Sequence, residues 1–360
     1  MSKIKIHDPF FGKEERRAVE KVFDSHLWAS PKNNNKVSEF EKKFQSYLKC
    51  DECVAVDSGS AALLLSLSLM DIKNKEVIIP SFCHISLANA VVHNGGKPIF
   101  VDIDPKNLCL DVDLVKKAIT KKTKVIVPVH FGGIPCDMHK LKQLTRNYKI
   151  NLVEDAALAT GSNYKNKKIG SHSELVCFSF HPVKIIAAPK GGAIALNGSN
   201  SKKFKKILST LRNSGVSQQS PNSVNQVGWN SYMNEFSAAI CLEQLKKLNK
   251  MVSIRYQIAK QYHNKISIDE KMPLQKASSY NFYWLLVKNP KIFTKKMREN
   301  NIEVGNYHPP THTSQYYQTR KKLVNTEFIA KHHVLLPTHP NLSTEAVSYT
   351  HLTLPTNREV

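Results

Sequence analysis

Short apolar segments recur between residues 54 and 196, and their alternation with amphipathic stretches constrains the fold more than any other sequence feature. The segments are VAV at 54–56, EVIIP at 76–80, PIFVDI at 98–103, KVIVPV at 124–129, NLVED at 151–155, LVCFSF at 175–180 and AIAL at 193–196. They are brief, rich in β-branched residues and apolar on both faces, as buried parallel strands are. Helical patterns at 61–70 and 111–120 separate some of them. The alternation predicts an α/β domain with a mainly parallel, seven-stranded sheet.

A smaller α+β unit is expected toward the C-terminus. One long helix is predicted over 234–266, where apolar residues recur at helical spacing. Apolar segments at 282–287 and 334–337 follow it, with a helical pattern near 292–301 between them. We therefore divide the chain into a large domain, residues 1–245, and a small domain, residues 246–347.

The last residues break the pattern of the small domain. Ser343 is a suitable N-cap for a helix that begins at Thr344 and Glu345. The helical pattern stops after Val347, and the segment SYTHLTLPTNREV shows no continuation of it. We expect residues 348–360 to be a non-native tail and the native final helix to be missing.

The chain is strongly basic, with 52 Lys and Arg against 29 Asp and Glu and a net charge of +23. The lysines are spread along the whole chain and accompany no nucleic-acid-binding motif, so we expect no nucleic-acid partner. Diffuse positive potential would attract a small anion such as a nucleotide sugar. The alternative is that these lysines only solvate helix faces.

Location and metal content follow from what the sequence lacks. No apolar run approaches the roughly 20 residues of a membrane span, and the N-terminus has no signal-peptide pattern, so a cytoplasmic protein without a membrane partner is expected. The seven cysteines are scattered, and Cys50 and Cys53 form a CxxC with no second pair at zinc-site spacing. We expect reduced thiols and no metal.

Three segments carry candidate chemistry, and the first is DSGSAALLLSL at 57–67. Gly59 and Ser60 lie between a predicted strand and a predicted helix. Glycine permits close approach of a ligand to the backbone, and a helix start offers free N–H groups, which together suit a phosphate. A turn followed by an ordinary N-cap is the alternative.

The other two segments place a carboxylate and an amine after buried strands. Asp155 ends NLVED, where a protonated pyridine nitrogen could pair with it; helix capping is the alternative. Lys184 follows LVCFSF among apolar neighbours, which can lower its pKa, although a lysine in such a place is usually exposed. A phosphate anchor, an Asp and a Lys in this order are what pyridoxal 5'-phosphate enzymes need, and no GxGxxG supports a dinucleotide site.

The ordered motifs resemble the DegT/DnrJ/StrS family of sugar aminotransferases over residues 6 to about 347. The matching stretches are VSEFEKKFQSYL, DSGSAALLLSL, EVIIPSFCHISLANAVVHNGGKPIFVDID, VIVPVHFGGIPCDM, LVEDAA, GSHSELVCFSFHPVK, GGAIALN and NEFSAAICLEQLKKL. The resemblance implies the aspartate aminotransferase fold (fold type I) and a homodimer with active sites at the subunit interface. It also implies glutamate as the amino donor and a keto group on a nucleotide-linked deoxysugar as the acceptor.

The same resemblance assigns roles to individual residues. Lys184 would bind the cofactor covalently and move protons, and Asp155 would keep the pyridine nitrogen protonated. The phosphate would be held by Gly59, Ser60 and Ser179, with Asn230 from the partner subunit. His84 takes the place of an aromatic ring that stacks on the cofactor; a purely structural histidine is the alternative.

Three positions depart from the family pattern. Leu158 replaces a Gln or His, the stretch AAPKGG at 187–192 replaces an acidic residue by Lys190, and Tyr232 replaces an Arg. These departures leave a catalytically weakened binding or regulatory protein as the alternative function. Because Lys184 is retained, the sugar-dehydratase relatives that carry His in its place are disfavoured.

Overall fold

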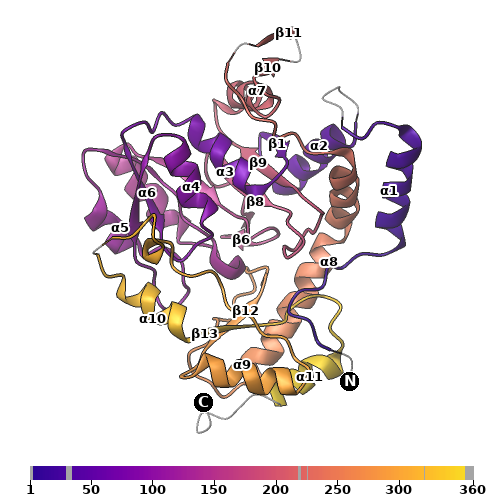
Figure 1. Ribbon diagram of the computed structural model, residues 1–360, viewed down its shortest axis with the longest axis vertical. Coiled ribbons are helices and arrows are strands. Elements are labelled where there is room, and N and C mark those ends of the chain that lie inside the picture. The colour runs from indigo at the N-terminus through magenta and orange to yellow at the C-terminus, as the bar shows by residue number, and fades with distance from the viewer. Residues whose placement is uncertain (1–2, 30–34, 218–219, 225, 320, 353–360) are drawn as a thin grey trace.

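A seven-stranded sheet forms the centre of the molecule (Figure 1). The computed structural model describes residues 3–29, 35–217, 220–224, 226–319 and 321–352. In spatial order the strands are β1 (Glu52–Val56), β9 (Gly192–Leu196), β8 (Leu175–Ser179), β5 (Asn151–Asp155), β4 (Thr123–Ile126), β2 (Glu76–Pro80) and β3 (Lys97–Val101). Strand β9 runs antiparallel to β1 and β8, and the remaining neighbours are parallel. The predicted α/β fold with a mainly parallel sheet is confirmed.

Each predicted apolar segment overlaps one of these strands, although β3 and β4 end before their segments do. Strand β3 ends at Val101 and β4 at Ile126, before the ends of their apolar runs. Pro128 has no N–H to donate to a continued ladder, and Val129 makes only an isolated bridge to Asp155. The apolar residues after β4 are therefore buried without being part of a regular strand.

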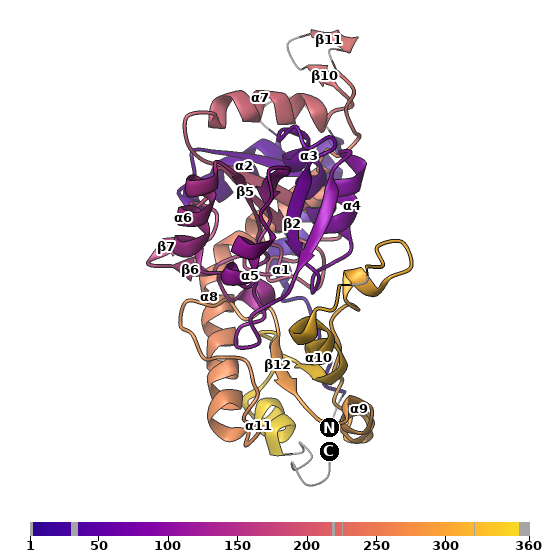
Figure 2. The same ribbon diagram turned by 90° about the vertical axis from the view of Figure 1, so that its left-hand side faces the viewer.

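Helices cover both faces of the sheet. The helices of the large domain are α1 (Lys13–Ser25), α2 (Lys36–Leu48), α3 (Gly59–Ser68), α4 (Ser86–His93), α5 (Val112–Ala118), α6 (Met138–Tyr148) and α7 (Ser201–Leu211). One apolar core joins α3, α4 and α7 to one face, and α2, α5 and α6 pack on the other. Figure 2 shows α4 and α6 on opposite sides of the sheet. Two short hairpins, β6 (Asn163–Tyr164) with β7 (Lys167–Lys168) and β10 (Val216–Ser217) with β11 (Ser220–Val224), project from this body.

The long helix α8 (Glu235–Lys265) connects the large domain to the small one (Figure 1). It is capped by Asn234, as the predicted span of 234–266 requires. The small domain contains β12 (Tyr283–Leu286) paired with β13 (His333–Leu336), and helices α9 (Pro290–Glu299) and α10 (Val324–His332). The boundary proposed at residue 245 lies inside α8. The division into two domains therefore stays a prediction, because no loop separates the domains at that residue.

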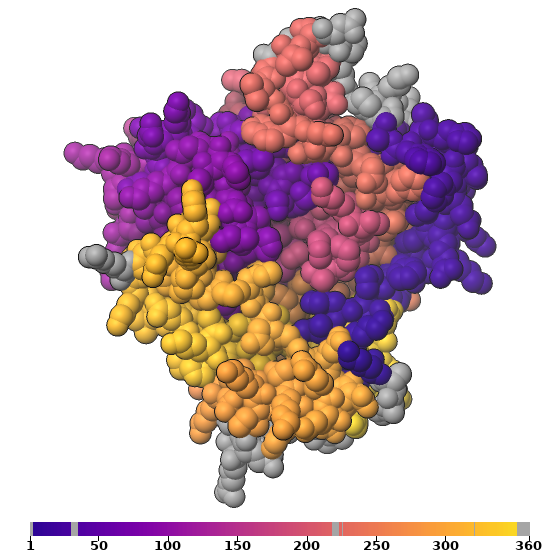
Figure 3. Space-filling view, in the orientation of Figure 1, coloured from indigo at the N-terminus to yellow at the C-terminus, as the bar shows by residue number. Residues whose placement is uncertain are grey.

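The N-terminal segment lies against the small domain, although the helices that follow it in sequence belong to the large domain. Ile4 forms a parallel bridge with Ile302, and its N–H donates to the Asn301 carbonyl at 2.9 Å. Figure 3 shows this segment, in the darkest indigo, beside the orange residues of the small domain. The described part of the chain contains no helix long and apolar enough to cross a membrane.

The prediction that the last helix stops after Val347 is wrong. Helix α11 spans Thr344–Leu352, and Ser343 Oγ accepts the N–H of Ala346 at 3.1 Å, as expected of an N-cap. Val347 and Thr350 are both buried, and the Thr350 hydroxyl donates to the Ala346 carbonyl. Packing of these two side chains thus extends the helix beyond the point where its sequence pattern fades. Residues 353–360 of the expected tail lie outside the described residues.

Candidate functional site

A cavity of about 450 Å³ lies at the carboxyl ends of β5 and β8 and brings most of the predicted site residues together. The predicted residues that line it are Gly59, Ser60, His84, Asp155, Ser179 and Lys184. They come from five segments of the chain, and the α/β topology makes their strand ends and helix starts meet at one edge of the sheet. Asn230 does not line this cavity.

The start of α3 forms one end of the cavity. Ser58 is its N-cap, and its Oγ accepts the N–H of Ala61 at 3.1 Å. Gly59 and Ser60, in the first turn, have no helical carbonyl to which their N–H groups could donate. A Cβ added to Gly59 would lie 2.6 Å from Ser179 Cβ, so the end of β8 approaches the helix start too closely for any side chain. The result is a compact cradle of backbone donors and a serine hydroxyl that suits a phosphate.

Asp155 lies deeper in the cavity, at the end of β5, with 5 % of its surface exposed. Its Oδ1 accepts the N–H of Ala157 at 3.0 Å, whereas Oδ2 has no hydrogen-bond partner among the described residues. Burial raises the pKa of this carboxyl group, and the Ala157 N–H and the Lys184 charge only partly oppose that change. A buried carboxylate with one free oxygen fits a protonated ring nitrogen as its missing partner.

Lys184 lies in the turn that follows β8, where its N–H donates to the His181 carbonyl at 2.8 Å. The side chain is half-buried and lines the same cavity as Asp155. Burial lowers the pKa of its amine to about 8, and the nearby Asp155 carboxylate limits the decrease. An amine with this pKa is partly unprotonated near neutral pH, which attack on an aldehyde requires.

His84 forms part of the cavity wall together with a second histidine. Its Nδ1 lies 2.7 Å from Ser86 Oγ, and its ring meets that of His308 edge-on, with centroids 4.7 Å apart. Desolvation, together with the charges of His308 and Lys184, lowers the pKa of His84 to about 4. The imidazole is therefore neutral near pH 7, as a ring that stacks on another ring should be.

Sequence reasoning missed the side chains that close the cavity from the small domain and from the N-terminus. They are His7, Asn281, Phe282, Asn306, Tyr307 and His308. The segment NYHPPTH at 306–312 carries two histidines and a tyrosine within seven residues, which is the one local signal that could have pointed to it. Tyr307 packs against Phe82, Phe131 and Phe282, which fixes this segment over the cavity.

The three departures from the family pattern occupy different surroundings. Leu158 is buried and lines the cavity, so an apolar contact stands where a hydrogen bond was expected. Lys190 also lines the cavity. Tyr232 lies outside the cavity; its hydroxyl accepts from Asn35 Nδ2 at 2.9 Å, and the Arg212 guanidinium lies 4.8 Å from its ring centre.

Asn230 is exposed, in the segment between β11 and α8. Its backbone forms an isolated bridge with Asn213. Asn230 does not line the cavity of its own chain, and its contact with a phosphate from a partner subunit stays a prediction.

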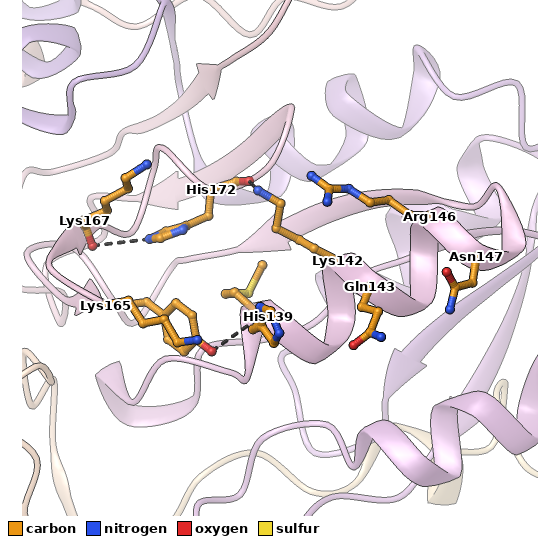
Figure 4. Close-up of a pocket in the computed structure, with 10 residues that line it drawn as sticks. His139, Lys142, Gln143, Arg146, Asn147, Lys165, Lys167 and His172 are labelled. Carbon is orange, nitrogen blue, oxygen red and sulfur yellow. Dashed lines mark hydrogen bonds between the residues drawn. The ribbon is translucent and has the colours of Figure 1, made fainter.

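A larger hollow of about 630 Å³ lies between α6 and the β6–β7 hairpin, but it lacks the groups for this chemistry (Figure 4). Its lining contains Lys142, Arg146, Lys165 and Lys167, and no carboxylate. Lys142 Nζ donates to the His172 carbonyl at 2.7 Å, and a His172 ring nitrogen lies 3.3 Å from the Lys167 carbonyl. We therefore place the candidate active site in the cavity that holds Asp155 and Lys184.

Among the described residues, no group of His, Cys, Asp or Glu side chains is arranged to hold a metal ion.

The sheet order, the phosphate cradle, the buried Asp155 and the half-buried Lys184 define a pyridoxal-phosphate-dependent transferase of fold type I. The model of the DegT/DnrJ/EryC1/StrS aminotransferase family matches residues 9–353. The chain belongs to this family, and the predictions of an enzyme of the aminotransferase class and of pyridoxal 5'-phosphate as its cofactor are confirmed.

Individual relatives extend over nearly the whole chain. The dTDP-4-dehydro-2,3,6-trideoxy-D-glucose 4-aminotransferase of Saccharopolyspora spinosa is 30% identical, over 94% of this chain and 92% of its own. The GDP-perosamine synthase of Escherichia coli O157:H7 is 29% identical, over 97% of each chain. The crystal structure of S. venezuelae DesV in complex with a ketimine intermediate superposes with a TM-score of 0.88 at 28% identity, covering 94% of this chain and 93% of that one.

Proposed function

We propose that this aminotransferase moves an amino group from an amino acid, with glutamate as the donor, to a keto group of a nucleotide-linked deoxysugar. The observation that carries the proposal is one cavity that holds a phosphate cradle, the buried Asp155 carboxylate and the Lys184 amine of lowered pKa. The acceptor class is supported by the sugar aminotransferase and the perosamine synthase to which the chain is similar. The basic lining of the cavity, with Lys184 and Lys190, suits anionic substrates.

Asp155 and Lys184 carry the chemical steps of this reaction. Bound pyridoxal phosphate supplies an aldehyde for the amino group and a ring that accepts electrons. Asp155 Oδ2, which has no hydrogen-bond partner in the described part of the chain, would hold the proton on the ring nitrogen. Lys184 Nζ would bind the aldehyde carbon and, once displaced by substrate, take and return the proton of the substrate carbon.

The remaining residues position the reactants. The N–H groups of Gly59 and Ser60 and the hydroxyl of Ser179 would bind the phosphate. The neutral His84 ring and the Leu158 side chain would enclose the ring, and the segment with Tyr307 and His308 would exclude water from the other side. Fixed geometry of this kind supplies much of the rate increase in transfer reactions.

A homodimer completes the proposed site. Asn230, which does not line the cavity of its own chain, would contribute to phosphate binding from a second subunit. Phe23, Leu27 and Trp28 are each at least half exposed, and Phe23 and Trp28 pack on Phe236, which forms an apolar patch suited to a subunit contact. We also propose a cytoplasmic location, because all seven cysteines are buried free thiols, as expected in a reducing compartment.

The test combines spectroscopy with turnover. Purified protein should show the visible absorption of bound pyridoxal phosphate, lose it in Lys184→Ala, and form pyridoxamine phosphate with glutamate. Lys142→Ala, which changes a lysine of the other hollow, is the matched control and should behave like the unchanged protein. A protein that binds no pyridoxal phosphate would contradict the proposal.

A second candidate, a binding or regulatory protein without turnover, is favoured by Leu158 and Lys190 in the cavity. The two candidates differ in one measurement. A panel of 3-keto and 4-keto nucleotide sugars, added to the pyridoxamine phosphate form and followed by mass spectrometry, should yield an aminated sugar. Steady amination of any member would eliminate the second candidate, and its absence across the panel would favour it.

A further inference from the structure

Lys190 is the residue at the mouth of the cavity that the proposed reaction leaves without a task. It lies in the loop between β8 and β9, six residues after Lys184, and lines the cavity together with Gly59 and Ser60. Its side chain is 62% exposed, and Nζ lies 2.8 Å from Asp57 Oδ2. An ion pair with one partner so exposed contributes little to the stability of the protein. Stability therefore does not explain why Lys190 lies beside the first turn of α3.

Asp57 connects Lys190 to the start of α3. While Oδ2 accepts from Lys190, Oδ1 accepts the Ser58 hydroxyl proton at 2.9 Å. Ser58 Oγ in turn accepts the N–H of Ala61 and caps the helix. Lys190 is therefore two hydrogen bonds away from the N-cap of the helix whose first turn forms the phosphate cradle.

The backbone holds this arrangement close to the cradle. A Cβ added to Gly192 would lie 2.5 Å from the backbone carbonyl of Ser58, so the start of β9 is pressed against the N-cap. Lys190 comes two residues before this contact, which leaves its backbone little room to move away. The flexible part is the side chain, whose four methylene groups can carry the ammonium from one acceptor to another.

We propose that Lys190 is a phosphate-binding residue of this chain, which exchanges its bond to Asp57 for a bond to the cofactor phosphate. A phosphate monoester carries a charge of about −1.5 to −2 at neutral pH, more than the single charge of Asp57. Helix α3 offers only partial positive charge, and a full cation beside it gives a charge-assisted hydrogen bond. The inference rests on the proposed function, because it needs the phosphate in the cradle.

The experiment compares the affinities of the protein, freed of its cofactor, for pyridoxal phosphate and for pyridoxal, which has the same aldehyde and no phosphate. Lys190→Met should weaken the binding of pyridoxal phosphate roughly ten- to hundredfold, the effect of one charged hydrogen bond, and leave pyridoxal unchanged. Lys190→Arg should stay near the unchanged protein. Lys246→Met, which breaks a comparable exposed ion pair with Glu243 outside the cavity, is the matched control and should change neither affinity.

Asp57→Asn separates phosphate binding from a merely structural role. Asparagine can still accept the Ser58 proton but gives up the ion pair and releases Lys190. If Lys190 binds phosphate, Asp57→Asn should bind pyridoxal phosphate as tightly as the unchanged protein or more tightly. If Lys190 only supports the helix cap through Asp57, Lys190→Met and Asp57→Asn should weaken binding alike, which would overturn the proposal.

Two further outcomes would also overturn it. In the first, Lys190→Met binds pyridoxal phosphate normally but uridine diphosphate less tightly, which would assign the ammonium to a substrate phosphate. The second is an equal loss of affinity for pyridoxal and pyridoxal phosphate in Lys190→Met together with weak binding of pyridoxal phosphate by Lys190→Arg. That result would indicate a disturbed fold and no role for the charge at position 190. If the unchanged protein binds no pyridoxal phosphate at all, the proposed function fails first, and the two failures are thereby distinguished.

Discussion

Gly59→Ala tests the geometry of the phosphate cradle, and the sign of the change in the free energy of unfolding is itself informative. Gly59 is the first residue of α3 and its φ is not in the left-handed region, so Ala would ordinarily stabilise the protein by about 0.4–1 kcal/mol. The added Cβ, however, would lie 2.6 Å from Ser179 Cβ, 3.1 Å from its Oγ and 3.3 Å from its Cα. Carbon atoms prefer about 3.5–4.0 Å, so the helix start and the strand end must separate by roughly 1 Å. Overpacking of this kind costs about 1–3 kcal/mol, and we expect net destabilisation.

Urea unfolding of the cofactor-free protein measures this effect without any contribution from ligand. Ser179→Gly is the matched change, because it removes the Cβ that Gly59→Ala would meet. The double variant should therefore be more stable than the sum of the two single effects predicts. If Gly59→Ala raised the free energy of unfolding, or if the two changes were simply additive, the close approach of α3 and β8 would be refuted.

The remaining predictions concern titration and a buried charge. The reaction of the cofactor-free protein with pyridoxal phosphate should accelerate about tenfold per pH unit below pH 8 and level off above it, because the pKa of Lys184 is about 8 and only its unprotonated amine reacts. Asp155→Asn removes a charge that favours the ammonium form, so it should move this midpoint to lower pH; a midpoint near the ordinary value for lysine would contradict the argument. His130→Ala should lower the free energy of unfolding by about 3–5 kcal/mol, because it removes a partner of a buried carboxyl group. His130 Nε2 lies 2.8 Å from the Glu154 carboxylate, and no other described residue forms a hydrogen bond with that group. Urea unfolding measures the change, and an unchanged urea concentration at half-unfolding would count against the prediction.

Local patterns in the sequence were sufficient for the elements of the large domain. Each apolar run overlaps a strand, and the spacing of Asn234 to Ile266 predicted α8 to within a residue at each end. Asp155 and Lys184 could be placed together because both follow strands whose carboxyl ends meet at one edge of a parallel sheet. Order along the chain, combined with topology, was enough for that inference.

Other features depend on contacts between distant segments, which periodicity does not encode. His308 and Tyr307 reach the cavity because the small domain packs over it, and no pattern near residue 307 specifies that packing. Helix α11 continues past its visible pattern because buried Thr350 hydrogen-bonds within the helix. The contact of Lys190 with Asp57 joins residues 133 positions apart, so the sequence shows only that Lys190 departs from the family motif.

Helix α8 limits how the enzyme can open and close. Its 31 residues contain neither Gly nor Pro, and its buried side chains belong to two cores, with Leu248 and Met251 in one and Ile258 and Tyr262 in the other. Moving the two domains apart would require bending this continuous helix, whose two ends are each packed in a hydrophobic core. Entry and exit of substrates should therefore fall to the mouth of the cavity, whose side chains can rearrange while the frame behind them stays still.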